Sequence, residues 1–83
     1  MAYEFEYTDT FGGEANYSWV RRETFTFDDS PTDRTLVRRA KRWAGISGRR
    51  CTVENYGDSI TIRPREGLTV LFIQWVDDPV TNS

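Results

Sequence analysis

The sequence predicts an α+β domain in which a mostly antiparallel sheet of about five strands carries one amphipathic helix on one face. Five segments show the alternation or the apolar runs of strands, and one segment shows the 3.6-residue period of a helix, in the order β-β-α-β-β-β. The chain has 83 residues, of which 37% are hydrophobic and 14% aromatic. This composition suits one compact core, and the length is too short for two domains. We expect one domain over residues 1–78 and a flexible tail over residues 79–83.

The first two predicted strands form a long hairpin. Aromatic residues alternate with glutamates over residues 3–7, which is typical of a strand with one buried face. The Gly12-Gly13 pair supplies the positive backbone angles of a tight reversal, and the segment YSWVRRETFTF after it is rich in β-forming residues. Arg21 and Glu23 have odd numbers, as the aromatic residues of this segment do, so in a regular strand they share one face with those aromatic residues. Because an unpaired charge enters an apolar core only at a large desolvation cost, the middle of this strand is expected to be exposed or bulged.

The helix is predicted from its two ends and its period. Ser30 is expected to be the N-cap, with Pro31 at the first helical position and Asp33 completing a capping-box-like pattern. Gly45 is expected to end the helix as a left-handed C-cap. The apolar side of the helix consists of Leu36, Val37, Ala40, Trp43 and Ala44.

We predict that Leu36, Ala40 and Trp43 are buried against the last two strands. Those strands follow a short strand that begins at Cys51 and a turn at Gly57-Asp58. Pro64 cannot donate to a ladder and is expected to close the fourth strand. The run LTVLFIQWV is apolar on both parities, which indicates a strand in the middle of the sheet.

The composition excludes the common catalytic and metal-binding arrangements. The chain contains no histidine and one cysteine, so the usual general base and the usual His and Cys zinc ligands are absent. Cys51 is interpreted as an inert core thiol. The two pairs of adjacent aspartates, Asp28-Asp29 and Asp77-Asp78, are interpreted as solubilising and capping charges at the ends of helices and strands, and not as metal ligands. We therefore expect no enzymatic activity, no cofactor and no metal.

The hydropathy pattern also bears on where the protein resides. The N-terminus has no basic start followed by an apolar run, and the longest apolar stretch, 70–73, is far too short to cross a bilayer. We expect a cytoplasmic protein with no membrane partner, present as a monomer or a weak dimer.

The charges are unevenly distributed, although the net charge is only −2. Residues 34–50 contain seven Arg or Lys residues and no acid, whereas residues 1–20 contain four acids and no cation. A basic helix face can follow phosphates or dock on an acidic protein, and the alternative is a solvated face balanced by acids elsewhere. The candidate partner surface consists of Arg34, Arg38, Arg39, Lys41, Arg42, Arg49 and Arg50.

A second candidate surface lies on the second strand. It consists of Tyr17, Trp19, Arg21 and Arg22, and Trp, Tyr and Arg are the residue types enriched at interface hot spots. The alternative is that Trp19 packs under the helix beside Trp43.

Three stretches, TDTFGGEANYSW, KRWAGISGRRC and YGDSITIRP, resemble small proteins carried by phages and mobile elements of bacteria, a group that includes anti-CRISPR inhibitors. The resemblance covers most of the chain but contains no motif diagnostic of an activity, so it assigns no site residues. It implies a non-enzymatic protein in the bacterial host that binds a CRISPR effector complex and blocks target DNA recognition or nuclease recruitment. The alternative is a small DNA- or RNA-binding accessory or regulatory protein that uses the basic segment 34–50.

Overall fold

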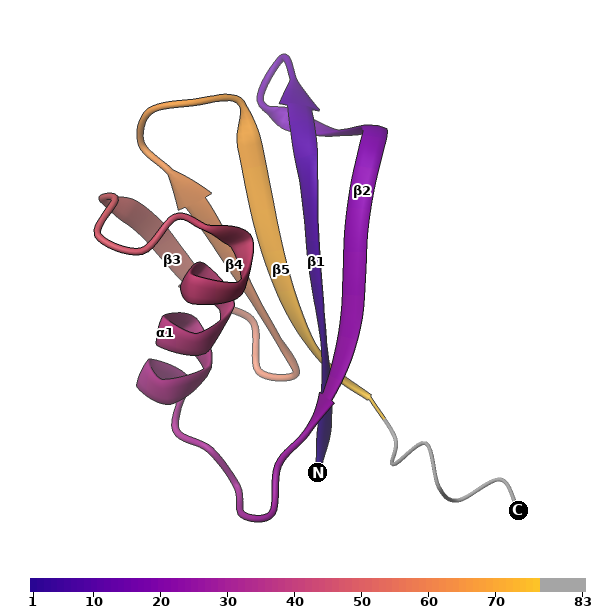
Figure 1. The fold of residues 1–83 in the computed structure, drawn as a ribbon. Helices are drawn as coiled ribbons and strands as arrows, with labels where there is room; N and C mark the ends of the chain where they lie inside the picture. The colour runs from indigo at the N-terminus through magenta and orange to yellow at the C-terminus, as the bar shows by residue number, and fades with distance from the viewer. Residues whose placement is uncertain (77–83) are drawn as a thin grey trace.

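A computed structural model describes residues 1–76 as five antiparallel strands and one helix (Figure 1). The elements are β1 (Ala2–Phe11), β2 (Glu14–Thr26), α1 (Asp33–Ala44), β3 (Cys51–Asn55), β4 (Ser59–Pro64) and β5 (Thr69–Val76). The predicted α+β class and the predicted element order are confirmed. The remainder of the expected domain, 77–78, and the expected tail, 79–83, lie outside the described residues.

The strand order across the sheet is β2-β1-β5-β4-β3. The centre is therefore β5, as predicted, and it pairs with β1 on one side and β4 on the other, with Ala2 opposite Val76. Strands β2 and β3 are neighbours in the sequence of strands but occupy opposite edges of the sheet. The connection between them crosses one whole face of the sheet, and α1 forms the middle of this connection (Figure 1).

The core lies between α1 and the face of the sheet that the helix covers. Its side chains come from alternate positions of the strands, as the pleat of a sheet requires. The buried core cluster consists of Phe5, Tyr7, Leu36, Ala40, Ala44, Ile46, Ile60, Ile62, Leu71 and Ile73. We call the other face, which carries Glu4, Glu6, Thr61, Phe72 and Gln74, the open face.

The start of α1 differs from the prediction. The N-cap is Thr32 and not Ser30, and the Thr32 hydroxyl oxygen accepts a hydrogen bond from the Thr35 amide at 3.1 Å. Pro31 therefore precedes the helix. Threonine caps almost as well as serine, and this start places Asp33 in the first turn, where its carboxylate meets the positive end of the helix.

The end of α1 is the predicted one. Gly45 has a φ of 79°, and its amide donates to the Arg42 carbonyl while the Ile46 amide donates to the Lys41 carbonyl. This pair of hydrogen bonds is a Schellman motif, and Ile46 folds back into the core with 2% of its surface exposed.

Trp43 packs against a different part of the sheet from the one predicted. Leu36 and Ala40 are buried as expected, but Trp43 is half-buried and lies over Phe5 of β1 and Phe25 of β2, with ring centroids 5.8 and 6.4 Å away. The prediction was wrong because the helix crosses the sheet. Its last turn reaches the β1–β2 side, while its earlier turns lie over the centre.

Trp43 contacts the two charged residues, Arg21 and Glu23, that lie on the core-facing side of β2. The indole N–H donates to the Glu23 carboxylate at 3.0 Å, and the Arg21 guanidinium lies 4.7 Å from the centre of the indole ring. Arg21 also donates to the Trp43 carbonyl at 3.1 Å, which satisfies one of the last carbonyls of the helix. Both charges therefore have partners at the margin of the core, and this part of β2 is exposed as predicted.

Within residues 1–76, the helical segment α1 has 12 residues and is rich in charge, so it does not meet the length and hydropathy of a membrane-spanning helix.

Truncation of Trp43 tests how strongly this contact holds the helix on the sheet. Trp43→Ala removes two edge-to-face ring contacts, one cation–π contact and one hydrogen bond. We expect a loss of about 3 kcal/mol in the free energy of unfolding, the lower end of the range for tryptophan because the ring is half-buried. Urea denaturation followed by circular dichroism measures this loss. Trp75→Ala, at an exposed position, is the control and should cost less than about 1 kcal/mol. Equal losses in the two variants contradict the assignment.

Candidate functional site

Three cations of α1 line a groove at the edge of the sheet. Arg34, Arg38 and Lys41 lie on the flank of the helix that faces β3, which is an edge strand. The groove has a volume of about 480 Å³, and we call it the edge groove. Among residues 1–76, the residues that line it are Asp33, Arg34, Val37, Arg38, Lys41, Ser47, Gly48 and Val53.

A second group of cations lies where β4 turns into β5. Arg49, Arg50 and Arg65 line a hollow of about 740 Å³ together with Glu66 and Gly67. The Arg65 amide donates to the Arg50 carbonyl at 2.9 Å, which continues the β3–β4 ladder by one pair and sets these two arginines opposite each other.

Arg65 was missing from the predicted site, although the sequence contained a signal for it. In an antiparallel hairpin the sequence numbers of paired residues have a constant sum. A hairpin that turns at Gly57-Asp58, as predicted, therefore places residue 65 opposite residue 50. Arg49, Arg50 and the later Arg65 therefore belong to one region of the surface.

The two groups are connected through the loop after α1. The Lys41 ammonium donates to the Arg49 carbonyl at 2.7 Å, which fixes the loop to the last turn of the helix. We call the combined region the basic surface. It consists of the cations that line the two hollows, Arg34, Arg38, Lys41, Arg49, Arg50 and Arg65. We include Arg42 as well, because it is exposed and follows Arg38 by one turn of the helix.

Arg39 does not belong to the basic surface. Its guanidinium lies 5.1 Å from the centre of the Phe27 ring, in the segment after β2. This places Arg39 on the flank of α1 opposite to Arg38, although the two residues are adjacent in the sequence. The predicted set of seven therefore splits into six cations on the basic surface and one apart from them.

The cations of the basic surface have no acidic partner among residues 1–76. The two ion pairs within these residues are Arg22 with Glu6 and Arg63 with Glu54, and both lie on the open face. An isolated helix face of this kind is commonly balanced by acids one turn away, and α1 has none beyond Asp33. The basic surface therefore presents unpaired positive charge to solvent.

The second predicted surface is divided by the sheet. Trp19 lies on the helix side, where its ring packs against Tyr7 with centroids 5.3 Å apart and not beside Trp43. Arg21 is on the same side. Tyr17 and Arg22 lie on the open face, where both bond to the Glu6 carboxylate. These four residues do not form one contiguous surface.

A bulge in β2 places Tyr17 on the open face. The β1–β2 register shifts between Thr8 and Thr10, and Tyr17 has a φ of 58°, a strained left-handed conformation for a tyrosine. The hydrogen bond from its hydroxyl to Glu6, at 2.9 Å, raises the pKa of Tyr17. The contact with Glu6 holds the side chain in place despite the strain.

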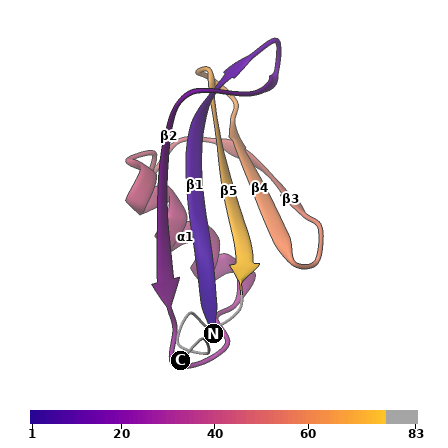
Figure 2. The same ribbon diagram turned by 90° about the vertical axis from the view of Figure 1, so that its right-hand side faces the viewer.

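Asp9 organises the residues of this bulge. Its carboxylate accepts hydrogen bonds from the Ser18 hydroxyl, from the Asn16 amide group at 3.0 Å and from the Ser18 backbone amide at 2.9 Å. Farther along, Arg63 of β4 donates to the Gly13 carbonyl at 2.9 Å. The end of the hairpin accordingly bends across the sheet toward β4, which Figure 2 shows with α1 behind the sheet.

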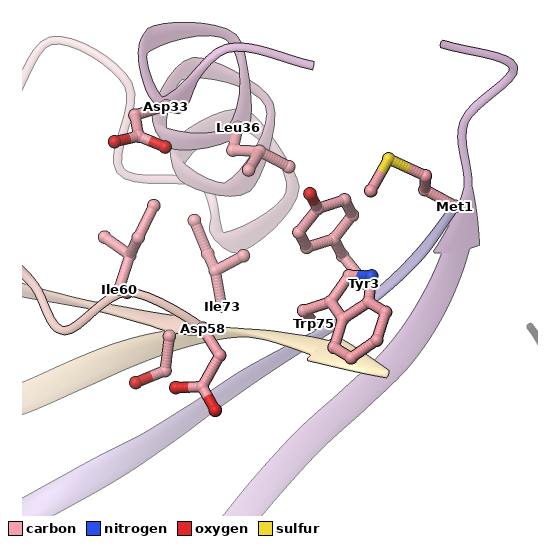
Figure 3. A pocket seen from close by; sticks show the side chains of 10 residues that line it. Met1, Tyr3, Asp33, Leu36, Asp58, Ile60, Ile73 and Trp75 are labelled. Atoms are coloured by element: carbon pink, nitrogen blue, oxygen red, sulfur yellow. The ribbon is translucent and has the colours of Figure 1, made fainter. Parts of the chain in front are cut away.

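A separate pocket of about 290 Å³ lies beneath the first turn of α1 (Figure 3). Leu36, Ile60 and Ile73 line it from the helix, β4 and β5, and Tyr3 forms part of its wall. The Asp33 carboxylate at its margin accepts a hydrogen bond from the Asn55 side chain.

Titratable groups elsewhere in the described chain are not arranged for metal binding. No group of three or more His, Cys, Asp or Glu residues within residues 1–76 could hold a metal ion. Cys51 is half-buried against the core, and its thiol contacts the Arg49 carbonyl at 3.5 Å. This is the core-side position that the sequence predicted for it.

Comparison of the chain with protein-family models, with curated proteins and with solved structures gave no match.

The bulge should depend on pH through Asp9. The hydrogen bonds from Ser18 and then Asn16 lower the pKa of Asp9 from its ordinary value of 3.8. Ionised Asp9 therefore stabilises the folded hairpin end above pH 3.8, and this stabilisation is lost as the pH falls from 3.8 toward the folded-state pKa. We expect the NMR signal of the Ser18 amide to keep its position at pH 3.8 and to move only at lower pH.

Asp9→Asn is the control, because its Ser18 amide should show no titration of residue 9. The Leu71 amide, in the centre of the sheet, reports on global unfolding during the same titration. A wild-type Ser18 signal with its midpoint at the ordinary carboxyl pKa contradicts the prediction.

Proposed function

We propose that this protein is a non-enzymatic interaction protein that docks its basic surface on an acidic region of a CRISPR effector complex and inhibits that complex. In this proposal, the bound protein blocks recognition of target DNA or recruitment of the nuclease. The resemblance to small phage and mobile-element proteins supports the class of partner. The geometry of the basic surface supports the mode of binding.

The observation that carries the proposal is the unpaired charge of the basic surface. Within residues 1–76, the acids that form ion pairs lie on the open face. The seven cations of the basic surface have no carboxylate oxygen within 4 Å. Complementary charge speeds the encounter of two proteins and aligns their contact surfaces. An acidic partner would supply the counter-charges that this protein does not supply itself.

The distribution of acids favours a protein partner over extended nucleic acid. The sequence pI is about 5.0, and Glu4 and Glu6 lie on the open face. A duplex that wrapped around the domain would meet these acids, whereas an acidic patch of a protein touches one side only. Proteins that bind nucleic acid without sequence preference usually have a basic overall charge.

Charge reversal of the basic surface tests the proposal. Arg34, Arg38 and Arg42 are exposed, and none of them donates a side-chain hydrogen bond within residues 1–76. The triple change of these residues to Glu should leave the fold intact and abolish inhibition. The measurement is phage plaquing on CRISPR-immune hosts that express each variant, with pull-down of the effector complex in parallel.

A matched pair of single variants controls for net charge. Arg38→Glu should weaken effector binding at least about tenfold, mainly through slower association. Arg39→Glu makes the same change of charge at the adjacent position, on the opposite flank of α1, and should have a much smaller effect. Unchanged plaquing by the wild-type protein, with no complex recovered from several effector types, would exclude the proposal.

Nucleic-acid binding is the second candidate, and the convergence of three arginines favours it. Arg49, Arg50 and Arg65 surround one hollow, and guanidinium groups in such an arrangement can bind phosphate. This candidate predicts affinity for DNA or RNA that falls steeply with salt, with a log–log slope of several units.

A gel shift with a short duplex and with a single strand at low salt measures this affinity. Arg65→Ala should weaken the complex and reduce the salt slope by about one unit. The paired residue Arg63, which bonds to Glu54 and Gly13, provides the control substitution Arg63→Ala. The absence of any complex at low salt excludes this second function.

A further inference from the structure

Within residues 1–76, the edge strand β3 has one hydrogen-bonding side that pairs with no other strand. The Tyr56 amide donates to the Ser59 carbonyl at 2.8 Å at one end of the β3–β4 ladder, and the Arg65 amide donates to the Arg50 carbonyl at 2.9 Å at the other. Hydrogen-bonded and non-hydrogen-bonded pairs alternate along an antiparallel ladder. The even-numbered residues of β3 therefore bond to β4, and the backbone groups of Cys51, Val53 and Asn55 point outward, away from the sheet.

The same residues direct their side chains to the helix side of the sheet. Val53 pairs with the buried Ile62 and therefore shares its face, yet it is 47% exposed because no strand of the described part of the chain lies beyond it. It faces Val37 across the edge groove. Free backbone groups and an exposed apolar side chain thus occur together at one place on the edge.

We infer that the edge groove binds an extended, acidic segment of the partner, which adds to the sheet as a sixth strand beside β3. This inference rests on the proposed function and specifies the form of the partner's contact. Main-chain hydrogen bonds to Cys51, Val53 and Asn55 supply the docking, as in other cases of strand addition. The edge groove supplies the selection of side chains.

The charges along the groove determine which side chains fit. A strand beside β3 turns every second side chain toward α1. One of these side chains lies on Val37 and Val53 and is apolar, and its neighbours two residues away reach Arg34 and Lys41 and are acidic. Asp33, which is the one acid among the lining residues within 1–76, already accepts a hydrogen bond from the Asn55 side chain.

The same charges disfavour a second copy of this chain as the occupant. Antiparallel pairing of β3 with β3 of another copy produces one continuous sheet with both helices on the same face. The Arg34, Arg38 and Lys41 side chains of the two copies would then meet across the junction. Like charges placed opposite one another destabilise such a contact.

The test is NMR titration of the full chain with designed peptides. The probe is acetyl-Thr-Glu-Thr-Ile-Thr-Glu-Thr-amide, which presents Glu, Ile and Glu on one face when extended. The control replaces both glutamates with lysine. We expect the acidic peptide, at concentrations up to about 1 mM, to shift the amide signals of β3 and of α1, and to bind at least about tenfold more tightly than the lysine peptide.

A pair of variants at Val53 separates strand addition from simple charge attraction. Val53→Pro removes one outward N–H that does not bond to β4, and Thr52 before it already has the extended conformation that proline requires. Val53→Ala removes the same apolar side chain but keeps the N–H. We expect Val53→Pro to lose peptide binding and Val53→Ala to weaken it only partly.

Three results overturn the inference: no shift of β3 signals at about 1 mM peptide, equal binding of the two peptides, or equal binding by the two Val53 variants. Tighter binding of a 12-base-pair DNA duplex at β3 overturns it as well, in favour of nucleic acid. The proposed function is judged separately by Arg38→Glu and Arg39→Glu in the plaquing assay. If those variants behave as expected and the peptide test fails, the basic surface binds the effector without an added strand.

Discussion

The contact of Trp43 with β1 and β2 fixes how the helix lies on the sheet. The sheet has five strands, and one helix of twelve residues covers only part of it. Leu36 and Ala40 occupy the centre, and the indole of Trp43 extends the helix contact to Phe5 and Phe25. The orientation of α1 about its own axis follows from this contact, and so does the direction in which every other side chain of the helix points.

This orientation separates the charges of the molecule into two classes. On the side of Trp43, Arg21, Glu23 and Arg39 each contact an aromatic ring. On the side of β3, the cations of the basic surface have neither an acidic partner nor a cation–π contact within residues 1–76. Charges near the aromatic rings therefore contribute to the fold, while those near the sheet edge are available to another molecule.

Most of the fold could be predicted from the sequence, because alternation, glycine turns and the helical period are local signals. The position of Trp43 could not, since it depends on the path of the helix across the sheet, which no local pattern encodes. The same holds for Tyr17. The odd-numbered Tyr17 and Trp19 are expected on the same face of a regular strand. Tyr17 instead lies on the open face, because the hydrogen bonds that the Asp9 carboxylate accepts stabilise a bulge there. For the candidate site, the cations of 34–50 were predictable as a group. Arg39 does not lie on the basic surface and Arg65 does, because the position of each side chain depends on the tertiary structure.

The two central strands, β1 and β5, come from the opposite ends of the described chain, with Ala2 paired to Val76. Among the described strands, β1 is therefore synthesised first, and β5, which joins β1 to β4, is synthesised last. Until then the nascent chain consists of two hairpins and a helix with no common sheet to cover. Folding of this domain therefore requires a high proportion of long-range contacts, so it should proceed more slowly than that of a helical protein of equal length.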